Sequence, residues 1–286
     1  MDNVYEILQE KLTLKQFPLS AKYDIKWAIE NEMGPSALWL MEYLVHGIDI
    51  KNVMRILDLG CGKALSSIFL AKEYNAQICA ADLWIKASDN MKRIIEKNSQ
   101  EYVFPINTEA HNLPFADECF DLILSVDSYH YYGTNDLYLD YILQYLKKGG
   151  QIGIVIPAVE REYGQNIPEK IKPYWEPDMY CFHTLEWWKN LWERSGKLTI
   201  KMAEIMPNGY NNWLLWDKTL KEMGVFKRSG DVELLEADKG NFTFIKIVGI
   251  KNRTRDSGSY SFRLKKSKIY PGAFQMVAHK NPKDSR

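Results

Sequence analysis

The sequence has few cysteines and no long apolar run. Its cysteines are far apart, with no C-x-x-C pair among them: Cys61, Cys79, Cys119 and Cys181. This spacing excludes a disulfide scaffold and an obvious zinc site, and it fits a reducing compartment. No stretch approaches the roughly 18–20 consecutive apolar residues of a membrane span, and the charged N-terminus is unlike a signal peptide. We therefore expect a cytoplasmic protein that binds neither a membrane nor a metal ion.

An excess of charge of one sign is also missing. The chain carries 37 Lys and Arg against 37 Asp and Glu, a formal net charge of zero. General binding to nucleic acids or to membrane surfaces depends on a basic excess, so we expect neither partner. Basic residues gather in residues 251–286, which hold ten Lys and Arg and two Asp. We interpret this segment as a solvated appendage, with an anion-binding tail as the alternative.

Short apolar runs alternate with helical patterns from residue 53 onward. The expected strands are residues 53–59, 77–83, 102–106, 121–126, 151–156, 198–205 and 241–250. The expected helices are residues 64–74, 86–98, 137–146 and 213–223, with another between Thr184 and Gly196. This alternation predicts right-handed βαβ units and a mostly parallel sheet covered on both faces. The fold class is therefore α/β, a Rossmann-like, doubly wound sheet of seven strands.

Segments outside this alternation define the expected domain boundaries. These are a helical lid at residues 1–50, a main domain at 51–251 with an aromatic-rich cap at about 158–183, and a basic extension at 252–286. Within the lid, Met33, Gly34 and Pro35 are expected to close over a ligand. In the extension, the alternation of large apolar residues over 260–264 predicts an added strand or hairpin.

The strongest signal is RILDLGCGKA at residues 55–64, in which a predicted strand runs into a glycine turn and then a helix. Gly60 and Gly62 allow a ligand to approach the backbone closely, with N–H groups of the next helix pointing at it. A dinucleotide site prefers G-x-G-x-x-G, but a leucine stands in place of the third glycine. Asp58 would repel a pyrophosphate but suits an amino group or a sulfonium. Asp82 ends the second strand, where it could accept from two ribose hydroxyls. These features favour S-adenosylmethionine (SAM) over NAD.

Three stretches together resemble the class I SAM-dependent methyltransferases, in particular the small-molecule branch related to the quinone-biosynthesis C-methyltransferases. They are ILDLGCGKA at 56–64, Asp82 after ICAA, and EAHNLPFADECFDLI at 109–123. The resemblance spans about residues 50–157. It implies that Asp82 binds ribose, that Gly60 and Gly62 bind methionine, and that Glu109, where the family usually has Asp, recognises adenine with the Ala110 backbone. The expected cofactor-binding residues are Asp58, Gly60, Cys61, Gly62, Asp82, Leu83, Glu109, Ala110 and Asp127.

The loop after the fourth strand, residues 125–133, should face the methyl group, because ligands of open α/β sheets bind beyond the carboxyl ends of the strands. His130 is the expected catalytic residue, a general base whose unperturbed pKa lies near neutrality. His183 is the second candidate. For both, simple packing or substrate binding is the alternative. A soft acceptor needs no base, since alignment alone can accelerate an in-line displacement.

Tryptophan is unusually frequent, and six of the nine lie within residues 175–216. One interpretation is a core between cap and sheet, to which we assign Trp188. The other is an aromatic pocket for a flat apolar acceptor or a cationic amine. The expected substrate-binding residues are Tyr129, Tyr131, Trp175 and His183.

The predicted function is methyl transfer from SAM to N, O, S or C of a small molecule by in-line displacement. One alternative is a SAM-binding protein without catalysis. Another is a methyltransferase acting on a macromolecule, which is disfavoured by the zero net charge and by the lack of an N/D-P-P-Y/F element after the fourth strand. An NAD-dependent oxidoreductase is a more distant alternative.

Overall fold

The computed structural model describes residues 2–164, 166–225, 231–253, 260–266 and 274–280. The chain divides into a large unit, Met1–Asn252, and a small unit, Arg253–Arg286. In the small unit, β8 (Tyr260–Lys266) pairs antiparallel with β9 (Phe274–Lys280), in agreement with the hairpin expected there. The large unit contains the main sheet and the candidate site.

The large unit is built on a seven-stranded sheet. Its strands are β1 (Arg55–Leu59), β2 (Gln77–Asp82), β3 (Val103–Asn107), β4 (Phe120–Val126), β5 (Leu146–Val159), β6 (Leu198–Ile205) and β7 (Phe242–Lys251). Their order across the sheet is β3-β2-β1-β4-β5-β7-β6. Strands β1 to β5 pair in parallel with one another, whereas β7 runs antiparallel between β5 and β6. The expected doubly wound, mostly parallel sheet of seven strands is confirmed. The usual dinucleotide-binding order, 3-2-1-4-5-6, lacks the inserted antiparallel strand.

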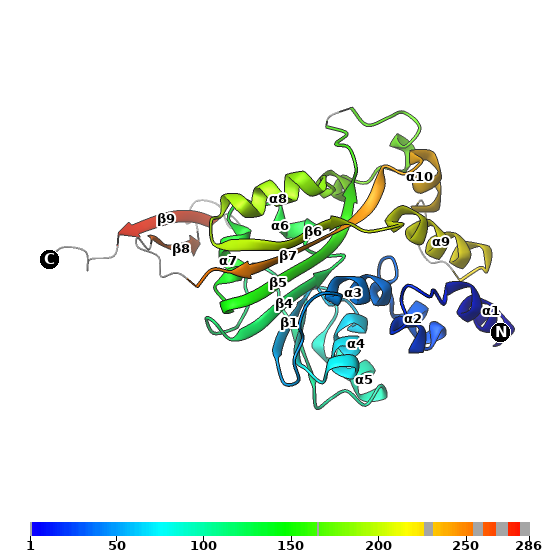
Figure 1. The fold of residues 1–286 in the computed structure, drawn as a ribbon, viewed down its shortest axis with the longest axis horizontal. Coiled ribbons are helices and arrows are strands. Elements are labelled where there is room, and N and C mark those ends of the chain that lie inside the picture. The colour runs from blue at the N-terminus through cyan, green and yellow to red at the C-terminus, as the bar shows by residue number, and fades with distance from the viewer. Residues whose placement is uncertain (1, 165, 226–230, 254–259, 267–273, 281–286) are drawn as a thin grey trace. The chain divides into compact units, whose positions relative to one another are not determined.

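Side chains of the central strands alternate between two hydrophobic clusters, one on each face of the sheet. On β1, Ile56 joins one cluster and Leu57 the other, and on β5 Val155 and Ile154 divide in the same way. Helices cover both faces (Figure 1), and those that pack on the central strands fall into two groups. They are α3 (Ala37–Val45), α4 (Leu65–Tyr74) and α5 (Ala87–Glu96) on the first face, and α6 (His130–Gly133), α7 (Tyr138–Leu143) and α8 (Leu185–Arg194) on the second. Because both faces are buried there, the central strands β1, β4 and β5 are largely apolar.

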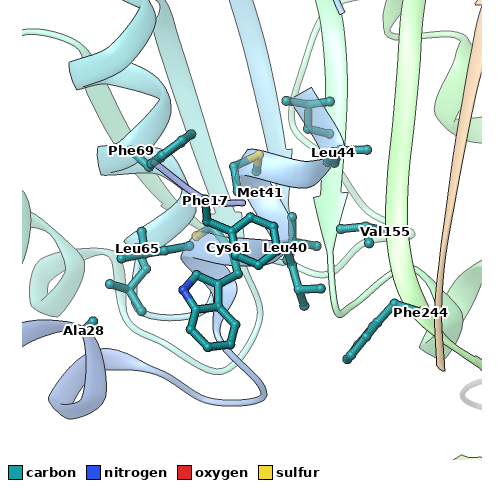
Figure 2. Packing of buried hydrophobic residues seen from close by; sticks show 14 of the residues in the cluster. Phe17, Ala28, Leu40, Met41, Leu44, Cys61, Leu65, Phe69, Val155 and Phe244 are labelled. Carbon is teal, nitrogen blue, oxygen red and sulfur yellow. The ribbon is translucent and has the colours of Figure 1, made fainter. Parts of the chain in front are cut away.

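The N-terminal segment is helical, as expected, and packs against the first face. It contains α1 (Asp2–Leu12), a 3-10 turn η1 (Ser20–Lys22), α2 (Ile25–Asn31) and α3. The buried Glu42 carboxylate accepts from the backbone N–H groups of Leu19 and Ser20 at 2.8 and 2.6 Å, which holds η1 on α3. Figure 2 shows Cys61 and Leu65, at the start of the glycine turn and of α4, among the side chains of this segment.

The structure corrects the expected boundary at Gly149 and Gly150. The sequence suggested a helix over residues 137–146 and a strand from residue 151, but α7 ends at Leu143 and β5 begins at Leu146, running through both glycines. A Cβ atom on Gly150 would lie 2.8 Å from the Asp121 carbonyl oxygen. This glycine therefore allows close backbone approach within a bent strand.

The C-terminal part of the large unit contains one helix that the sequence did not predict. This helix, α10 (Asp231–Asp238), packs on α9 (Gly209–Glu222) near β7. The cap expected between β5 and α8 contains only two 3-10 turns, η2 (Lys172–Tyr174) and η3 (Pro177–Cys181), among its described residues. Its lack of a regular period is the reason that no helix was predicted there.

Helix α8 closes the second face with tryptophan side chains. Thr184 caps it as expected, accepting from the Trp187 N–H at 3.3 Å. Trp188 and Trp192 are completely buried, and each ring centroid lies 5.9 Å from that of Tyr129. The assignment of Trp188 to the core is confirmed.

Candidate functional site

A cavity of about 330 Å³ opens at the carboxyl ends of β1 to β4. This volume is at the lower end of the roughly 300–1,000 Å³ of small-molecule sites. The strand ends of an open α/β sheet are where such ligands bind. Most of the predicted cofactor residues line it: Gly60, Cys61, Gly62, Asp82, Leu83, Glu109, Ala110 and Asp127.

The glycine turn after β1 is held against the end of β2 by backbone hydrogen bonds. The N–H groups of Gly60 and Cys61 both donate to the Ala81 carbonyl, at 2.8 and 3.1 Å. Gly60 has φ +75°, and a Cβ atom there would lie 1.9 Å from Ser128 Oγ. Both the backbone conformation and the close approach of the loop after β4 therefore require glycine.

Asp82, at the end of β2, organises the cavity floor. One carboxylate oxygen accepts from the Gly62 N–H at 2.8 Å. The other accepts from the N–H groups of Trp84 and Ile85, at 2.8 and 2.9 Å. A carboxylate has about four lone-pair sites, so three are used within the protein. We expected this side chain to accept from two ribose hydroxyls, but its internal bonds leave about one site.

Asp58 does not line the cavity, which corrects its expected direct contact with a ligand. It is fully buried, and one carboxylate oxygen accepts from the hydroxyls of Ser66 and Ser67, both at 2.6 Å. Burial raises the pKa of Asp58 to about 6, although the two serine hydrogen bonds oppose this shift. When ionised, Asp58 contributes negative potential beneath the glycine turn without touching the cavity.

The segment after β3 brings a carboxylate and an imidazole to the cavity. Glu109 Oε1 lies 2.7 Å from Nδ1 of His111, and both side chains are about half exposed. The His111 ring packs edge-on against Tyr138, at 5.0 Å between centroids. Tyr138 also donates to the Ala110 carbonyl at 3.1 Å. The sequence interpretation found Glu109 and Ala110 but missed His111, which directly follows them.

The loop after β4 supplies Asp127, Ser128, Tyr131 and Tyr132 to the cavity wall. The hydroxyl oxygen of Tyr132 lies 3.2 Å from the hydroxyl oxygen of Ser125 and 3.2 Å from that of Ser128. Burial raises the pKa of Tyr132 above its usual range, so the phenol stays protonated. Ser128 was not singled out, although it follows directly from the expected position of this loop.

The N-terminal segment also reaches the cavity, through Asn31, Met33, Gly34 and Pro35. Four large side chains at the opening are between 43% and 69% exposed. They are Met33, Leu83, Trp84 and Tyr131, which we call the apolar rim. The rings of Trp84 and Tyr131 meet edge-on at 6.2 Å. Grouped exposed apolar side chains of this kind commonly mark ligand-binding surfaces.

His130 is not at the cavity, which corrects its assignment as the base. The side chain is fully buried beside the Phe182 ring, 5.2 Å away. Neither ring nitrogen has a hydrogen-bond partner among the described residues. Burial lowers the pKa of His130 to about 3. An imidazole with this pKa is neutral near pH 7, and its ring packs between Phe182 and Tyr131 without lining the cavity itself.

Three of the four predicted substrate-binding residues also lie outside the cavity. Tyr129 is buried against α8. Trp175 is partly buried and packs on Tyr163, at 5.6 Å between centroids, against the core of the first face. His183 stacks on Trp187 at 3.8 Å and contacts Glu162. Of the predicted substrate residues, the structure brings Tyr131 to the cavity.

Neither a membrane-spanning helix nor a metal site is found in the described part of the chain. It holds no helix long and apolar enough to cross a membrane. Its His, Cys, Asp and Glu side chains form no group of three that could bind a metal ion.

Comparison with known proteins connects this cavity to methyltransferases. Residues 56–150 match a family model described as a methyltransferase domain. A glycine/sarcosine/dimethylglycine N-methyltransferase from Actinopolyspora halophila is 26% identical over 120 residues, which is 42% of this chain and 21% of that protein. A fatty-acid O-methyltransferase from Mycolicibacterium smegmatis is 30% identical over 97 residues, 34% of each chain. The chain thus spans between about a fifth and a third of the lengths of these curated relatives.

Among solved structures, phosphoethanolamine N-methyltransferase 2 of Haemonchus contortus, in complex with SAM, superposes with a TM-score of 0.67. The two sequences are 20% identical, and the superposed region covers 86% of this chain and 60% of the Haemonchus protein. The Rossmann-like fold of class I methyltransferases is thereby confirmed. The comparisons support the class I resemblance over the residues matched, and they are not specific to the quinone-biosynthesis branch.

The glycine turn generates the first prediction. In Gly60→Ala the new Cβ would meet Ser128, whereas in Gly62→Ala it would lie 3.1 Å from Met33 Sδ, the end of a flexible side chain. Both glycines have positive φ, so the backbone cost is shared. We expect Gly60→Ala to lose about 1–3 kcal/mol more stability than Gly62→Ala. Urea unfolding of both variants measures the difference, and equal losses would contradict this account of the turn.

The buried His130 generates a prediction on pH. Its pKa is about 3 in the folded protein and 6.5 ordinarily. Between these values the unfolded chain binds a proton that the folded chain does not, so stability falls as the pH falls below 6.5. The loss is about 2 kcal/mol by about pH 5. His130→Leu should remove this part of the acid sensitivity. Urea unfolding at about pH 7 and about pH 5 tests it, and an unchanged pH dependence would refute the assignment.

Proposed function

Because residues 56–150 match a methyltransferase domain, we propose that this chain is a SAM-dependent methyltransferase acting on a small molecule. The observation that carries the proposal is the cavity, whose wall combines the glycine turn with Asp82 and Glu109 at successive strand ends. A binding protein without catalysis would retain the same features, so turnover is the decisive measurement.

The residues present fit the cofactor by geometry and by charge. The Gly60–Gly62 backbone leaves room for the methionine part, Asp82 keeps one acceptor site for ribose, and Glu109 with Ala110 lies where adenine would be read. Asp58, Asp82 and Asp127 give the floor negative potential, which suits the positive charge of a sulfonium. Further contacts are proposed for Cys61 and Leu83.

Bound SAM would supply the methyl group: as the acceptor's lone pair forms the new bond, the S–CH3 bond would break, S-adenosylhomocysteine would leave, and an N–H or O–H acceptor would release its proton to solvent. The chain's part in this step is alignment and exclusion of water, which together can provide most of the acceleration. His111 is the imidazole at the cavity among the described residues, and it is paired with Glu109. Tyr131 is kept protonated, since burial and the nearby Asp127 and Asp178 raise its pKa. We therefore propose transfer by alignment, without His130 as the base.

We further propose that the acceptor has a flat apolar face and no anionic group. The apolar rim offers it the Trp84 and Tyr131 rings. No arginine of the described chain lines the cavity, and the Lys63 ammonium donates to the Glu30 carbonyl at 3.0 Å. A carboxylate or phosphate on the acceptor would face mainly carboxylates, whereas an uncharged or amine-bearing ring would be tolerated.

The cofactor assignment is tested by calorimetry with SAM and, separately, NADH. Asp82→Ala should weaken SAM binding by about 1–3 kcal/mol, because it removes the ribose acceptor and frees three N–H groups. Asp82→Asn keeps one acceptor oxygen and should lose less. Asp89→Ala, on the exposed side of α5, is the matched control and should bind as wild type. Unchanged affinity in folded Asp82→Ala, or preference for NADH, would overturn the assignment.

The acceptor class is tested with pairs of aromatic amines or phenols that differ by one added carboxylate, with methylation followed by product mass. We expect the uncharged or cationic member of each pair to be methylated faster. Trp84→Ala should raise the acceptor KM about tenfold, the loss of one aromatic contact. Phe104→Ala, an exposed ring outside the cavity, serves as control. Preference for carboxylates, or an unchanged KM in Trp84→Ala, would contradict the proposal. SAM binding without any methylated product would favour a non-catalytic role.

A further inference from the structure

Helix α5 stands between the glycine turn and the N-terminal segment that borders the cavity. Its Asn90 is almost completely buried and donates to the Gly62 carbonyl at 2.9 Å. The N–H of the same glycine donates to Asp82. Both polar groups of the Gly62 backbone are therefore fixed, one by the helix and one by the strand end.

Arg93 extends this set of hydrogen bonds from α5 to α2. Its NH1 group donates to Asn90 Oδ1 at 3.2 Å, and its Nε donates to Asn31 Oδ1 at 2.9 Å. Asn31 is the last residue of α2 and lines the cavity. The Arg93 guanidinium thus bridges Asn90, which holds the glycine turn, and Asn31, from which the N-terminal segment continues into the cavity wall.

Independent contacts bring the same two parts together. Lys63, in the glycine turn, donates to the Glu30 carbonyl at 3.0 Å. Met33 Sδ lies beside Gly62, since a Cβ atom on that glycine would be 3.1 Å from it. Further along α5, Lys97 Nζ lies 4.7 Å from the centroid of the Trp27 ring in α2. The N-terminal segment is therefore fastened to the glycine turn directly and through α5.

We propose that Arg93 is a positioning residue that couples cofactor binding at the glycine turn to closure of residues 30–37 over the cavity. This inference rests on the proposed function. The planar guanidinium is suited to the role because it donates in two directions from one rigid group, which a lysine ammonium cannot reproduce. Coupling of this kind is reciprocal, so a ligand that orders the turn also orders the segment.

The coupling is tested on the full chain with S-adenosylhomocysteine as probe, by calorimetry and by hydrogen exchange of amides in residues 25–37. In the wild type, the ligand should increase protection of these amides. Arg93→Met should weaken binding about tenfold, within the usual range of coupling between sites, and should remove most of the added protection. Arg93→Lys should behave in the same way. Lys92→Met, which removes only an exposed neighbour paired with Asp89, should match the wild type.

A double-mutant cycle distinguishes coupling from independent contacts. Asn31→Ala should weaken binding as Arg93→Met does, and the double variant should be no weaker than either alone. Wild-type affinity and protection in Arg93→Met, or additive losses in the double variant, would overturn the proposal. A wild type that binds neither SAM nor S-adenosylhomocysteine would refute the proposed function instead. In that case the coupling is judged in the unliganded protein, where Arg93→Met must exchange faster over residues 25–37 than Lys92→Met.

Discussion

The carboxylate of Asp82 is the constraint on which the cavity depends. It accepts three backbone N–H groups, one from the turn after β1 and two from its own loop. Each group would cost about 1–3 kcal/mol if it were buried without a partner, so the two loops are set before any ligand arrives. Asn90 of α5 donates to the carbonyl of the same Gly62 whose N–H is held by Asp82, so this glycine is fixed on both sides. A pre-set floor of this kind lowers the entropy cost of binding.

Much of the floor could be predicted from the sequence because it depends on local signals. A glycine turn after an apolar strand and an acid at the end of the next strand are set by neighbouring residues, and parallel strands bring their carboxyl ends to one edge. Gly60, Gly62 and Asp82 were found in this way, whereas Glu109 came from the resemblance to class I methyltransferases. His111 and Trp84 stand beside predicted residues, so the same reasoning extended by one residue would have included them.

The other expected site residues were misplaced because their positions depend on packing between distant segments. His130 packs against Phe182 of the cap, and Trp175 packs with Tyr163 against the core. A sequence pattern identifies such side chains as aromatic or titratable but does not say which face of a short helix is covered. Asp58 is a similar case, since Ser66 and Ser67 at the start of α4 turn its carboxylate inward.

The apolar rim differs from the floor in how freely it can change. Met33, Leu83, Trp84 and Tyr131 are substantially exposed, and substitutions at such positions usually alter stability little. The floor has no such freedom, because Gly60 and Asp82 are fixed by close approach and by internal hydrogen bonds. During evolution, the range of molecules accepted at the opening can therefore diversify by single substitutions while the part beneath it is retained. Related chains would be expected to differ most at the rim, and laboratory selection for a new acceptor would best begin with these four positions.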